Sequence, residues 1–264
     1  GPVTAARAAR SGRSGRSGRP SRPVVLVHGA WHGAWCWARV EAALAGLGVT
    51  DVVVPTLTGL GERRAELAPT VGLQTHVDDV VAVLDRLDGP VVLVGHSYAG
   101  LVVREAADRR PHAVAQLVVV DAWVGADGAS LLGLAPDWMV DYIRQAAADL
   151  GDGWRVPPPD PSFVGVDDPD DARWLRANLT DQPLATFVES TILTGAAADI
   201  PTTAVVSEPS FLPFRRFAEE AAWPVVALPG GHDLMVTAPQ PLAQAIAAAA
   251  EPASTPASPG PKTI

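Results

Sequence analysis

The sequence predicts an α/β fold in which a mostly parallel sheet is flanked by helices and carries an inserted helical cap. Short, continuous apolar runs recur along the chain, and amphipathic segments with helical periodicity separate them. Continuous apolar runs are typical of parallel strands that are buried on both faces. Hydrophobic residues make up 48% of the 264 residues and charged residues 19%, so the chain can bury a sizeable core and is not intrinsically disordered.

The predicted strands and helices alternate along the chain. The apolar runs predict strands at 24–27, 51–56, 90–96, 116–124, 202–207 and 224–230. The amphipathic stretches predict helices at 36–47, 73–87, 98–109, 213–222 and 239–250. This alternation predicts an α/β core formed by residues 22–127 and 199–250.

The interval 128–198 breaks the alternation, because it contains no convincing strand. It holds helical stretches, a loop rich in proline and aspartate, and the aromatic residues Trp138, Tyr142, Trp154, Trp174 and Phe187. We interpret the interval as a helical cap above the carboxyl edge of the sheet, where open α/β folds bind ligands. Two interpretations of the cap stay open: a surface excursion with its own small core, and a lid over the substrate.

Both ends of the chain are predicted to be flexible tails outside the fold. Residues 1–21 form an Arg/Gly/Ser-rich tail and residues 251–264 are rich in proline, so neither end has the apolar residues that packing requires. Six of the 20 basic side chains precede residue 24, whereas all 29 acidic ones follow it. The folded part is therefore strongly acidic and is expected to repel nucleic acid.

Composition excludes several other classes of protein. No apolar run approaches the roughly 18 residues of a membrane-spanning helix, and no apolar signal-peptide stretch follows the Arg-rich start. The single cysteine, Cys36, cannot form an internal disulfide, and no cysteines and histidines have zinc-site spacing. We expect a cytoplasmic protein with a small-molecule substrate and with no metal, membrane or nucleic-acid partner, and the sequence leaves a homodimer open.

The candidate nucleophile is Ser97. Residues 91–100, VVLVGHSYAG, predict a strand, a tight turn and the start of a helix. This is the context of a nucleophile elbow, in which a strained turn raises a serine hydroxyl above the sheet. Ala99 stands where the G-x-S-x-G pattern has its second glycine, but the extra methyl group is small and Gly100 follows it. The alternative is a serine that only caps the helix.

A loop after the first predicted strand supports this assignment. The sequence HGAWHGAWCW, residues 28–37, could direct the backbone N–H of Ala30 toward Ser97. Together with the N–H of Tyr98, it would form an oxyanion hole. We interpret His28 and His32 as residues that brace the loop rather than as catalytic groups.

The candidate general base is His232, in the sequence GGHDLM directly after the last predicted strand. Nucleophile elbows of this kind occur in folds whose catalytic groups follow the order serine, acid, histidine along the chain. That position brings the imidazole to the same sheet edge as Ser97, where it could accept the hydroxyl proton. Structural roles are assigned to the remaining histidines, which are His76, His96 and His112.

The motifs together resemble the α/β-hydrolase superfamily, in particular the group that contains plant methylesterases, hydroxynitrile lyases and their bacterial esterase-like relatives. The resemblance spans residues 24–250, is weak through the cap, and rests on VVLVHGAWHGAWCW, PTLTGLGERRAEL, LQTHVDDVVAVL, VVLVGHSYAG, LVVVDAWV and GGHDLMVTAPQPLA. The family implies an eight-stranded sheet, a triad of serine, histidine and an acid, and no cofactor.

Two residues are candidates for the acid. The plant relatives have an aspartate in the loop before the histidine strand, and the corresponding residues here, SEPS at 207–210, offer only Glu208. Asp121 closes the strand LVVVD and matches the position of the acid in haloalkane dehalogenases of the same fold. Either carboxylate could orient His232 and stabilise its cation, or could merely brace a loop. We favour Asp121 and keep Glu208 as the alternative.

The favoured function is a serine esterase or lactonase that acts through an acyl-enzyme on Ser97. Candidate pocket residues are Trp31, Trp123 and Trp138, which suit a small, apolar, aromatic or polycyclic substrate.

Two functions of other classes are alternatives. One is a lyase or cyclase that uses Ser97 and His232 only as acid and base, and the other is a vestigial ligand-binding protein. Hydroxynitrile lyases of the plant group generally have a threonine and a lysine where this chain has Gly29 and Asp233, which argues against cyanohydrin cleavage.

Overall fold

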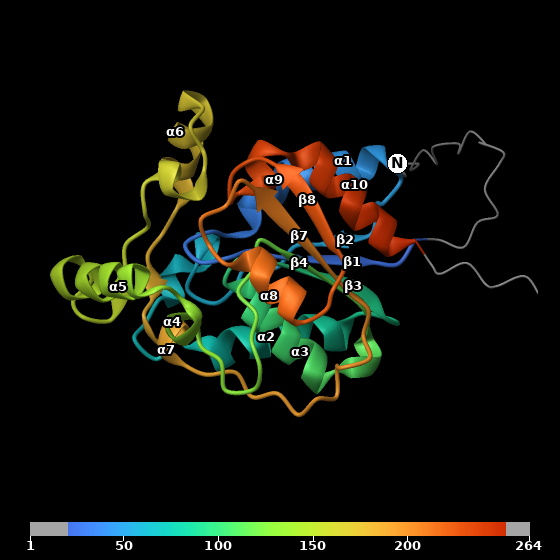
Figure 1. Ribbon diagram of the computed structural model, residues 1–264, viewed down its shortest axis with the longest axis horizontal. Helices are drawn as coiled ribbons and strands as arrows, with labels where there is room; N and C mark the ends of the chain where they lie inside the picture. Colours follow the sequence, from blue (N-terminus) through green and yellow to red (C-terminus); the bar gives the residue numbers. More distant parts are fainter. Residues whose placement is uncertain (1–20, 252–264) are drawn as a thin grey trace, which may run out of the picture.

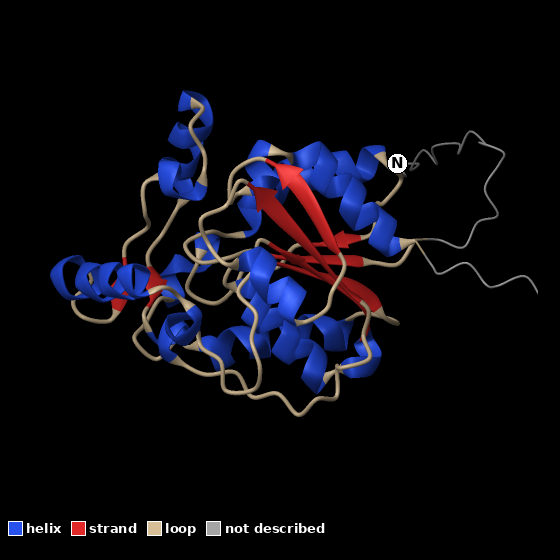
Figure 2. Cartoon of the chain, in the orientation of Figure 1, coloured by secondary structure: helices blue, strands red, loops and turns tan. Residues whose placement is uncertain are grey.

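A six-stranded sheet lies at the centre of the protein in the computed structural model, which describes residues 21–251 (Figures 1 and 2). The strand order is β2-β1-β3-β4-β7-β8, and all neighbours are parallel. The bounds are β1 Val24–Val27, β2 Val52–Val53, β3 Val91–His96, β4 Val114–Val120, β7 Thr202–Glu208 and β8 Val225–Pro229. Each predicted strand is present. The implied eight-stranded sheet is wrong for residues 21–251, because no further strand pairs with either edge.

Helices cover both faces of the sheet (Figure 1). One layer contains α1 (Ala38–Gly46), α9 (Leu234–Thr237) and α10 (Pro239–Ala250), and the other contains α2 (Leu73–Arg86), α3 (Ala99–Arg109) and α8 (Phe214–Glu220). Alternate side chains of a strand enter alternate layers: in β1, Val24 and Leu26 belong to the first layer, whereas Val25 and Val27 belong to the second. All four are fully buried, which explains why the strand is a continuous apolar run.

The insertion, residues 128–198, lies beyond the sheet edge, where α5 and α6 project away from the core in Figure 1. Its elements are α4 (Leu131–Leu134), α5 (Asp137–Leu150), β5 (Arg155–Val156), the 3-10 helix η4 (Pro161–Val164), α6 (Pro169–Asn178), β6 (Gln182–Pro183) and α7 (Ala185–Val188). The expectation of no strand here is wrong, because β5 and β6 form an antiparallel pair. Each has only two residues, too few to produce a strand pattern in the sequence.

Short 3-10 helices complete the core: η1 (Ala34–Trp37), η2 (Gly61–Glu66) and η3 (Pro111–Ala113). Among residues 21–251, no helix combines the length and apolar character that crossing a bilayer requires. The predicted tails, 1–21 and 251–264, lie outside the described residues except for one residue each. The parallel sheet positions the site. All of its strands have their carboxyl ends at the same side of the sheet, the carboxyl edge, and the candidate residues lie there.

Candidate active site

Ser97 occupies a strained turn between β3 and α3. Its φ of 55° is in the left-handed region, which side chains other than glycine seldom adopt. The turn requires close packing: a Cβ on Gly95 would lie 2.8 Å from the carbonyl oxygen of Ala99, and one on Gly100 would lie 2.4 Å from that of Trp123. Ala99 itself is fully buried, and its methyl group fits within the packed turn. The glycine that the helix approach requires is therefore Gly100, one residue later than in the usual pattern.

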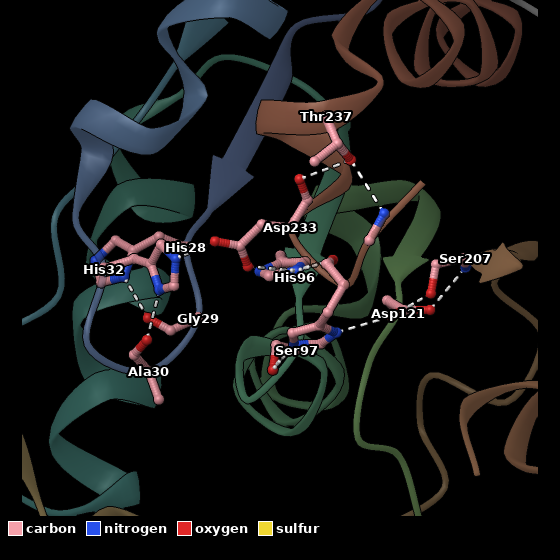
Figure 3. Close-up of polar contacts among 12 residues, drawn as sticks. His28, Gly29, Ala30, His32, His96, Ser97, Asp121, Ser207, Asp233 and Thr237 are labelled. Atoms are coloured by element: carbon pink, nitrogen blue, oxygen red, sulfur yellow. Dashed lines mark hydrogen bonds and ion pairs between the residues drawn. The ribbon is translucent and has the colours of Figure 1, made fainter. Parts of the chain in front are cut away.

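Three side chains form a hydrogen-bonded chain at the sheet edge (Figure 3). Ser97 Oγ lies 2.9 Å from His232 Nε2, and His232 Nδ1 lies 2.7 Å from Asp121 Oδ2. A carboxylate only accepts, so Nδ1 carries the proton and Nε2 is left to accept the serine hydroxyl proton. The imidazole also stacks on Phe214, with ring centroids 5.2 Å apart. This arrangement can activate a serine as a nucleophile.

The Asp121 carboxylate is held firmly from a second direction. It is buried and accepts hydrogen bonds from the backbone N–H of Ser207 at 2.8 Å and from the Ser207 hydroxyl at 2.9 Å. Asp121 has a φ of 44°, so β4 stops at Val120 and not at residue 124 as predicted. Sequence reasoning missed Ser207, although strand alternation in β7 could have placed it on the face of the sheet opposite to Glu208.

The structure does not bring Glu208 to the site. Glu208 ends β7 one residue after Ser207, so its side chain points the opposite way and its exposed carboxylate pairs with Arg215 at 2.6 Å. The alternative assignment of Glu208 as the acid therefore has no geometric support. Asp121 occupies the position beside His232.

The predicted oxyanion loop packs directly against the elbow. A Cβ on Gly29 would lie 2.9 Å from the His96 carbonyl oxygen and 3.0 Å from Ser97 Cβ, so only glycine allows this approach. Ala30 and Tyr98 line the same cavity as Ser97 and His232. Within residues 21–251, neither the Ala30 N–H nor the Tyr98 N–H donates to a protein acceptor. Both amides are free to bind an anion.

Trp31 joins the oxyanion loop to the insertion through all of its polar groups. Its backbone N–H donates to Gln182 Oε1, its indole N–H donates to the Val156 carbonyl, and its carbonyl accepts from the Thr180 N–H, each at 3.0 Å. Its φ of 66° is left-handed. Trp31 also lines the cavity. Gln182, which is fully buried, could not be found from sequence, because its partner lies 151 residues away.

The cavity at Ser97 is small and apolar. Its space amounts to about 20 Å³, near the volume that one water requires. The lining residues other than the chain of Ser97 and His232 are Ala30, Trp31, Tyr98, Trp123, Leu131, Met139, Phe163, Val164, Phe187 and Leu212. Trp123 is almost fully buried and packs edge-on to Phe214, so it forms part of the cavity wall. A group larger than about one water fits in this space only if part of the wall moves.

An aromatic cluster lies next to the cavity. We define the cluster as Trp138, Tyr142, Phe163 and Phe211, whose neighbouring ring centroids are 6.0 to 6.4 Å apart. Phe163 also lines the cavity, whereas Trp138 and Phe211 line an open groove of about 450 Å³. The cluster thus spans from the groove to the cavity. Sequence reasoning found Trp138 but missed Phe163 and Phe211.

Buried histidines brace the site. His28 donates from Nδ1 to the Gly29 carbonyl at 2.8 Å and accepts the Leu57 N–H at 3.0 Å, and burial lowers its pKa to about 3. His96 donates from Nε2 to the carbonyl of His232 at 2.9 Å, and burial, then His232, lower its pKa to about 4. These rings are therefore neutral near pH 7.

His76 lies behind Tyr98. Its Nδ1 is 2.9 Å from the Tyr98 hydroxyl and its Nε2 donates to the Thr58 carbonyl at 2.8 Å. Burial lowers the pKa of His76 to about 4. His112 is exposed and away from these contacts.

One group in the described residues has the spacing of metal ligands: His96, His232 and Asp233, whose candidate atoms lie within 4.8 Å of one another. Both ring nitrogens of His232 are already bonded to Ser97 and Asp121. A metal here would dismantle that chain, so these residues do not fit a metal centre.

Similar proteins exist in sequence. The model of the alpha/beta hydrolase family matches residues 24–245. A carbendazim hydrolyzing esterase from Nocardioides sp. (strain SG-4G) is 37% identical over 242 residues, which cover 85% of this chain and 98% of that protein. Methylesterase 7 of Arabidopsis thaliana is 37% identical over a shorter stretch of 103 residues, 38% of this chain and 39% of that protein.

Solved structures share the fold. An extracellular alpha/beta-hydrolase from a Paenibacillus species superposes with a TM-score of 0.75 at 21% identity, covering 87% of this chain and 98% of that one. A pyrethroid hydrolase from Sphingobium faniae JZ-2 gives a TM-score of 0.71 at 22% identity, covering 87% and 97%. Tomato methylketone synthase I gives 0.74 at 17% identity, covering 87% and 98%.

Proposed function

The chain belongs to the alpha/beta hydrolase family and is a carboxylic ester hydrolase, and we propose that it cleaves small aromatic esters through an acyl-enzyme on Ser97. The predicted family, fold class and ester hydrolysis are thereby confirmed. The observation that carries the mechanism is the chain of hydrogen bonds from Ser97 through His232 to Asp121. The proposed catalytic triad consists of these three residues.

In the first half of the reaction, Ser97 Oγ attacks the ester carbonyl while His232 Nε2 takes the hydroxyl proton. The carbonyl oxygen becomes an anion, and the N–H groups of Ala30 and Tyr98 stabilise it. Asp121 stabilises the imidazolium. The C–O bond to the alcohol then breaks, and the imidazolium gives its proton to the leaving oxygen.

In the second half, water attacks the acyl carbon and gives a proton to His232 Nε2. The tetrahedral intermediate uses the same two backbone N–H groups. Its collapse breaks the bond to Ser97 Oγ, which takes the proton back from His232. The acid product leaves and the resting site is restored.

Substrate recognition is assigned to the aromatic cluster. The apolar cavity beside Ser97 favours a small acyl or alkoxy group, whereas the exposed rings of Trp138 and Phe211 can stack on a flat aromatic portion in the groove. The similar carbendazim hydrolyzing esterase supports a small-molecule substrate.

The insertion is proposed to act as a cap. Met139 and Phe163 from the insertion close the cavity from one side, and Leu212 from the loop after β7 closes it from another. Entry of a substrate requires these side chains to separate, and their return excludes water from the reacting atoms.

The lyase and binding-protein alternatives gain no support from a specific observation. The site has a nucleophile paired with its base, and Asp233 is buried and bonded to His32, so it does not face the cavity as a further acid or base. The cytoplasmic location and a homodimer stay sequence predictions.

The experiment that tests the proposal combines turnover with covalent labelling. Aryl acetates and methyl esters of aromatic acids are assayed with the wild type, with Ser97→Ala, and with Ser190→Ala as a control at an exposed serine. We expect Ser97→Ala to lose about 10⁴-fold or more in kcat, because the nucleophile is removed. A fluorophosphonate should label Ser97 and leave other serines untouched. Normal turnover by Ser97→Ala, or labelling at another serine, would contradict the mechanism.

A further inference from the structure

The oxyanion loop and the loop of the catalytic base meet at a second histidine–carboxylate pair that the mechanism above does not use. We propose that His32 and Asp233 form a charged brace that fixes the position of Ala30 relative to His232. His32 and Asp233 are then positioning residues for the hydrolysis. The proposal rests on the function assigned to Ala30 and His232.

His32 lies between two acceptors. Its Nδ1 is 2.6 Å from the carbonyl oxygen of Ala30, and its Nε2 is 2.6 Å from Asp233 Oδ2. A carbonyl oxygen can only accept, so Nδ1 must donate to Ala30; an ionised carboxylate can only accept, so Nε2 must donate as well. An imidazole that donates from both nitrogens carries a positive charge. With Asp233 ionised, this geometry describes an ion pair and not a neutral hydrogen bond.

The surroundings favour this charged form. Burial lowers the pKa of His32, but the Asp233 carboxylate outweighs burial and raises it overall. Burial raises the pKa of Asp233, but His32 outweighs burial and lowers it overall. Four other titratable groups face the pair. They are His28 and His96, whose rings are neutral at pKa values of about 3 and 4, the buried thiol of Cys36 from η1, and His232 itself. In residues 21–251, His32 is the cation that balances Asp233.

Each partner is attached to a different part of the reaction centre (Figure 3). Ala30, whose N–H is one arm of the oxyanion hole, is held at its carbonyl by His32. Asp233 directly follows His232, whose own carbonyl is held by His96, the neighbour of Ser97. The brace therefore completes a ring of contacts through the oxyanion loop, the elbow and the base loop.

Orientation, and not net stability, is the effect expected of such a pair. Both side chains are almost completely buried, and the cost of removing two charges from water largely cancels their attraction. What a buried pair supplies is a fixed direction, since each bond is short and charge-assisted. His32 is further held in plane by stacking on Trp35, with centroids 5.6 Å apart.

Two substitutions at His32 separate its two bonds. An asparagine amide nitrogen can take the place of Nδ1 and retain the bond to Ala30, whereas a glutamine amide nitrogen can take the place of Nε2 and retain the bond to Asp233. We expect His32→Gln to lower kcat by about 10²-fold with KM changed less than about threefold, because an oxyanion donor loses its support. His32→Asn should lose about tenfold or less, since the Ala30 carbonyl keeps a donor. His112→Gln, at an exposed histidine, should behave as the wild type.

The pH profile provides a readout that a purely structural role would not move. In His32→Asn the Asp233 carboxylate has no cation beside it, and it lies next to His232, which also faces Asp121. The acidic limb of the kcat/KM profile should therefore shift to higher pH. Adding Asp233→Asn to the same variant should return the limb toward its original position.

The charge on His32 can be measured without a substrate. Nitrogen-15 NMR of the wild-type protein should show both ring nitrogens of His32 in the protonated form at pH 7.5, while those of His28 show a neutral ring. A neutral His32 would overturn the proposal, and so would His32→Gln with wild-type kcat. If His32→Gln does not fold, the wild-type spectrum decides. Failure of the esterase assignment itself would appear instead as absent turnover and absent fluorophosphonate labelling in the wild type.

Discussion

The sheet edge and the aromatic cluster meet at the same cavity, but their side chains are held in different ways. At the sheet edge, Ser97, His232 and Asp121 are linked by directional bonds of 2.9 and 2.7 Å, and Asp121 is 1% exposed. In the cluster, Trp138 is 48% and Phe211 70% exposed, and the rings contact one another through non-directional packing. The comparison teaches that proton transfer needs fixed geometry, whereas recognition of an apolar group tolerates adjustment.

The largest effect is expected at Asp121, the proposed acid of the triad. Asp121→Asn should lower kcat by about 10³ to 10⁴-fold, because an amide cannot hold the imidazole in the required tautomer or stabilise its cation. Steady-state kinetics with an aryl acetate measure it. Glu208→Gln is the matched control and should change kcat by less than about twofold, since its carboxylate pairs with Arg215 at the surface. Equal losses in the two variants would remove Asp121 from the proposed triad.

Acid should lower the stability of the protein through the buried histidines that brace the site. The pKa values of His28, His76 and His96 are lowered by burial to about 3, 4 and 4, below their unfolded value near 6.5. The folded state therefore resists protonation, and stability is fully present above about pH 6.5 and is lost as pH falls toward 4. Each histidine contributes up to about 1.4 kcal/mol per pH unit.

Urea unfolding between pH 7 and pH 4.5 measures this dependence. His76→Gln should reduce the slope of the unfolding free energy against pH by the amount that corresponds to about one proton. His112→Gln, at the exposed histidine, should leave this slope unchanged. A stability that stays constant across this range would show that the buried rings titrate normally.

A smaller effect, on the free energy of unfolding, is expected at Gly100, where the start of α3 packs against the carbonyl of Trp123. Gly100→Ala places a methyl group 2.4 Å from the Trp123 carbonyl oxygen, so the backbone must shift, at a cost of about 1–3 kcal/mol. Ala99→Gly, at the neighbouring position, removes a methyl group and should cost about 1 kcal/mol or less. Free energies of unfolding in urea compare the two. The reverse order would mean that Ala99 and not Gly100 controls the approach of α3.

The smallest effect is expected in the cluster. Trp138→Ala should raise KM for an aryl ester by about tenfold and leave kcat within about twofold, because it removes a stacking surface but no reacting group. Its free energy of unfolding should change by only about 0.5 kcal/mol or little more, since nearly half of the side chain is exposed. A small alkyl ester serves as the comparison substrate. A loss of kcat with unchanged KM would assign Trp138 to the chemistry.

Local patterns in the sequence were sufficient to predict much of the sheet and two of the residues at its carboxyl edge. The β-branched runs predicted each strand of the sheet, because burial on both faces leaves a continuous apolar signature. Ser97 and His232 could be named because each lies within a few residues of the carboxyl end of a strand, and parallel strands end at one edge. The choice between Asp121 and Glu208 needed the structure, since one residue of register decides to which face of the sheet a side chain points.

Other features had no local signature at all. The partners His32 and Asp233 are 201 residues apart, and Trp31 and Gln182 are 151 residues apart. Only the tertiary fold brings such pairs together. The aromatic cluster has the same origin, because Phe163 and Phe211 come from separate segments and meet above the cavity.

The tethering of Trp31 has a consequence for exchanging parts between related enzymes. Residues 128–198 look like a transferable module, yet Val156, Thr180 and Gln182 within them satisfy the backbone and indole groups of a tryptophan that belongs to the first loop of the core. A chimera that receives a foreign module would leave these buried donors and the acceptor of Trp31 without partners, which is costly. The natural unit of exchange is discontinuous, and Trp31 must travel with the module.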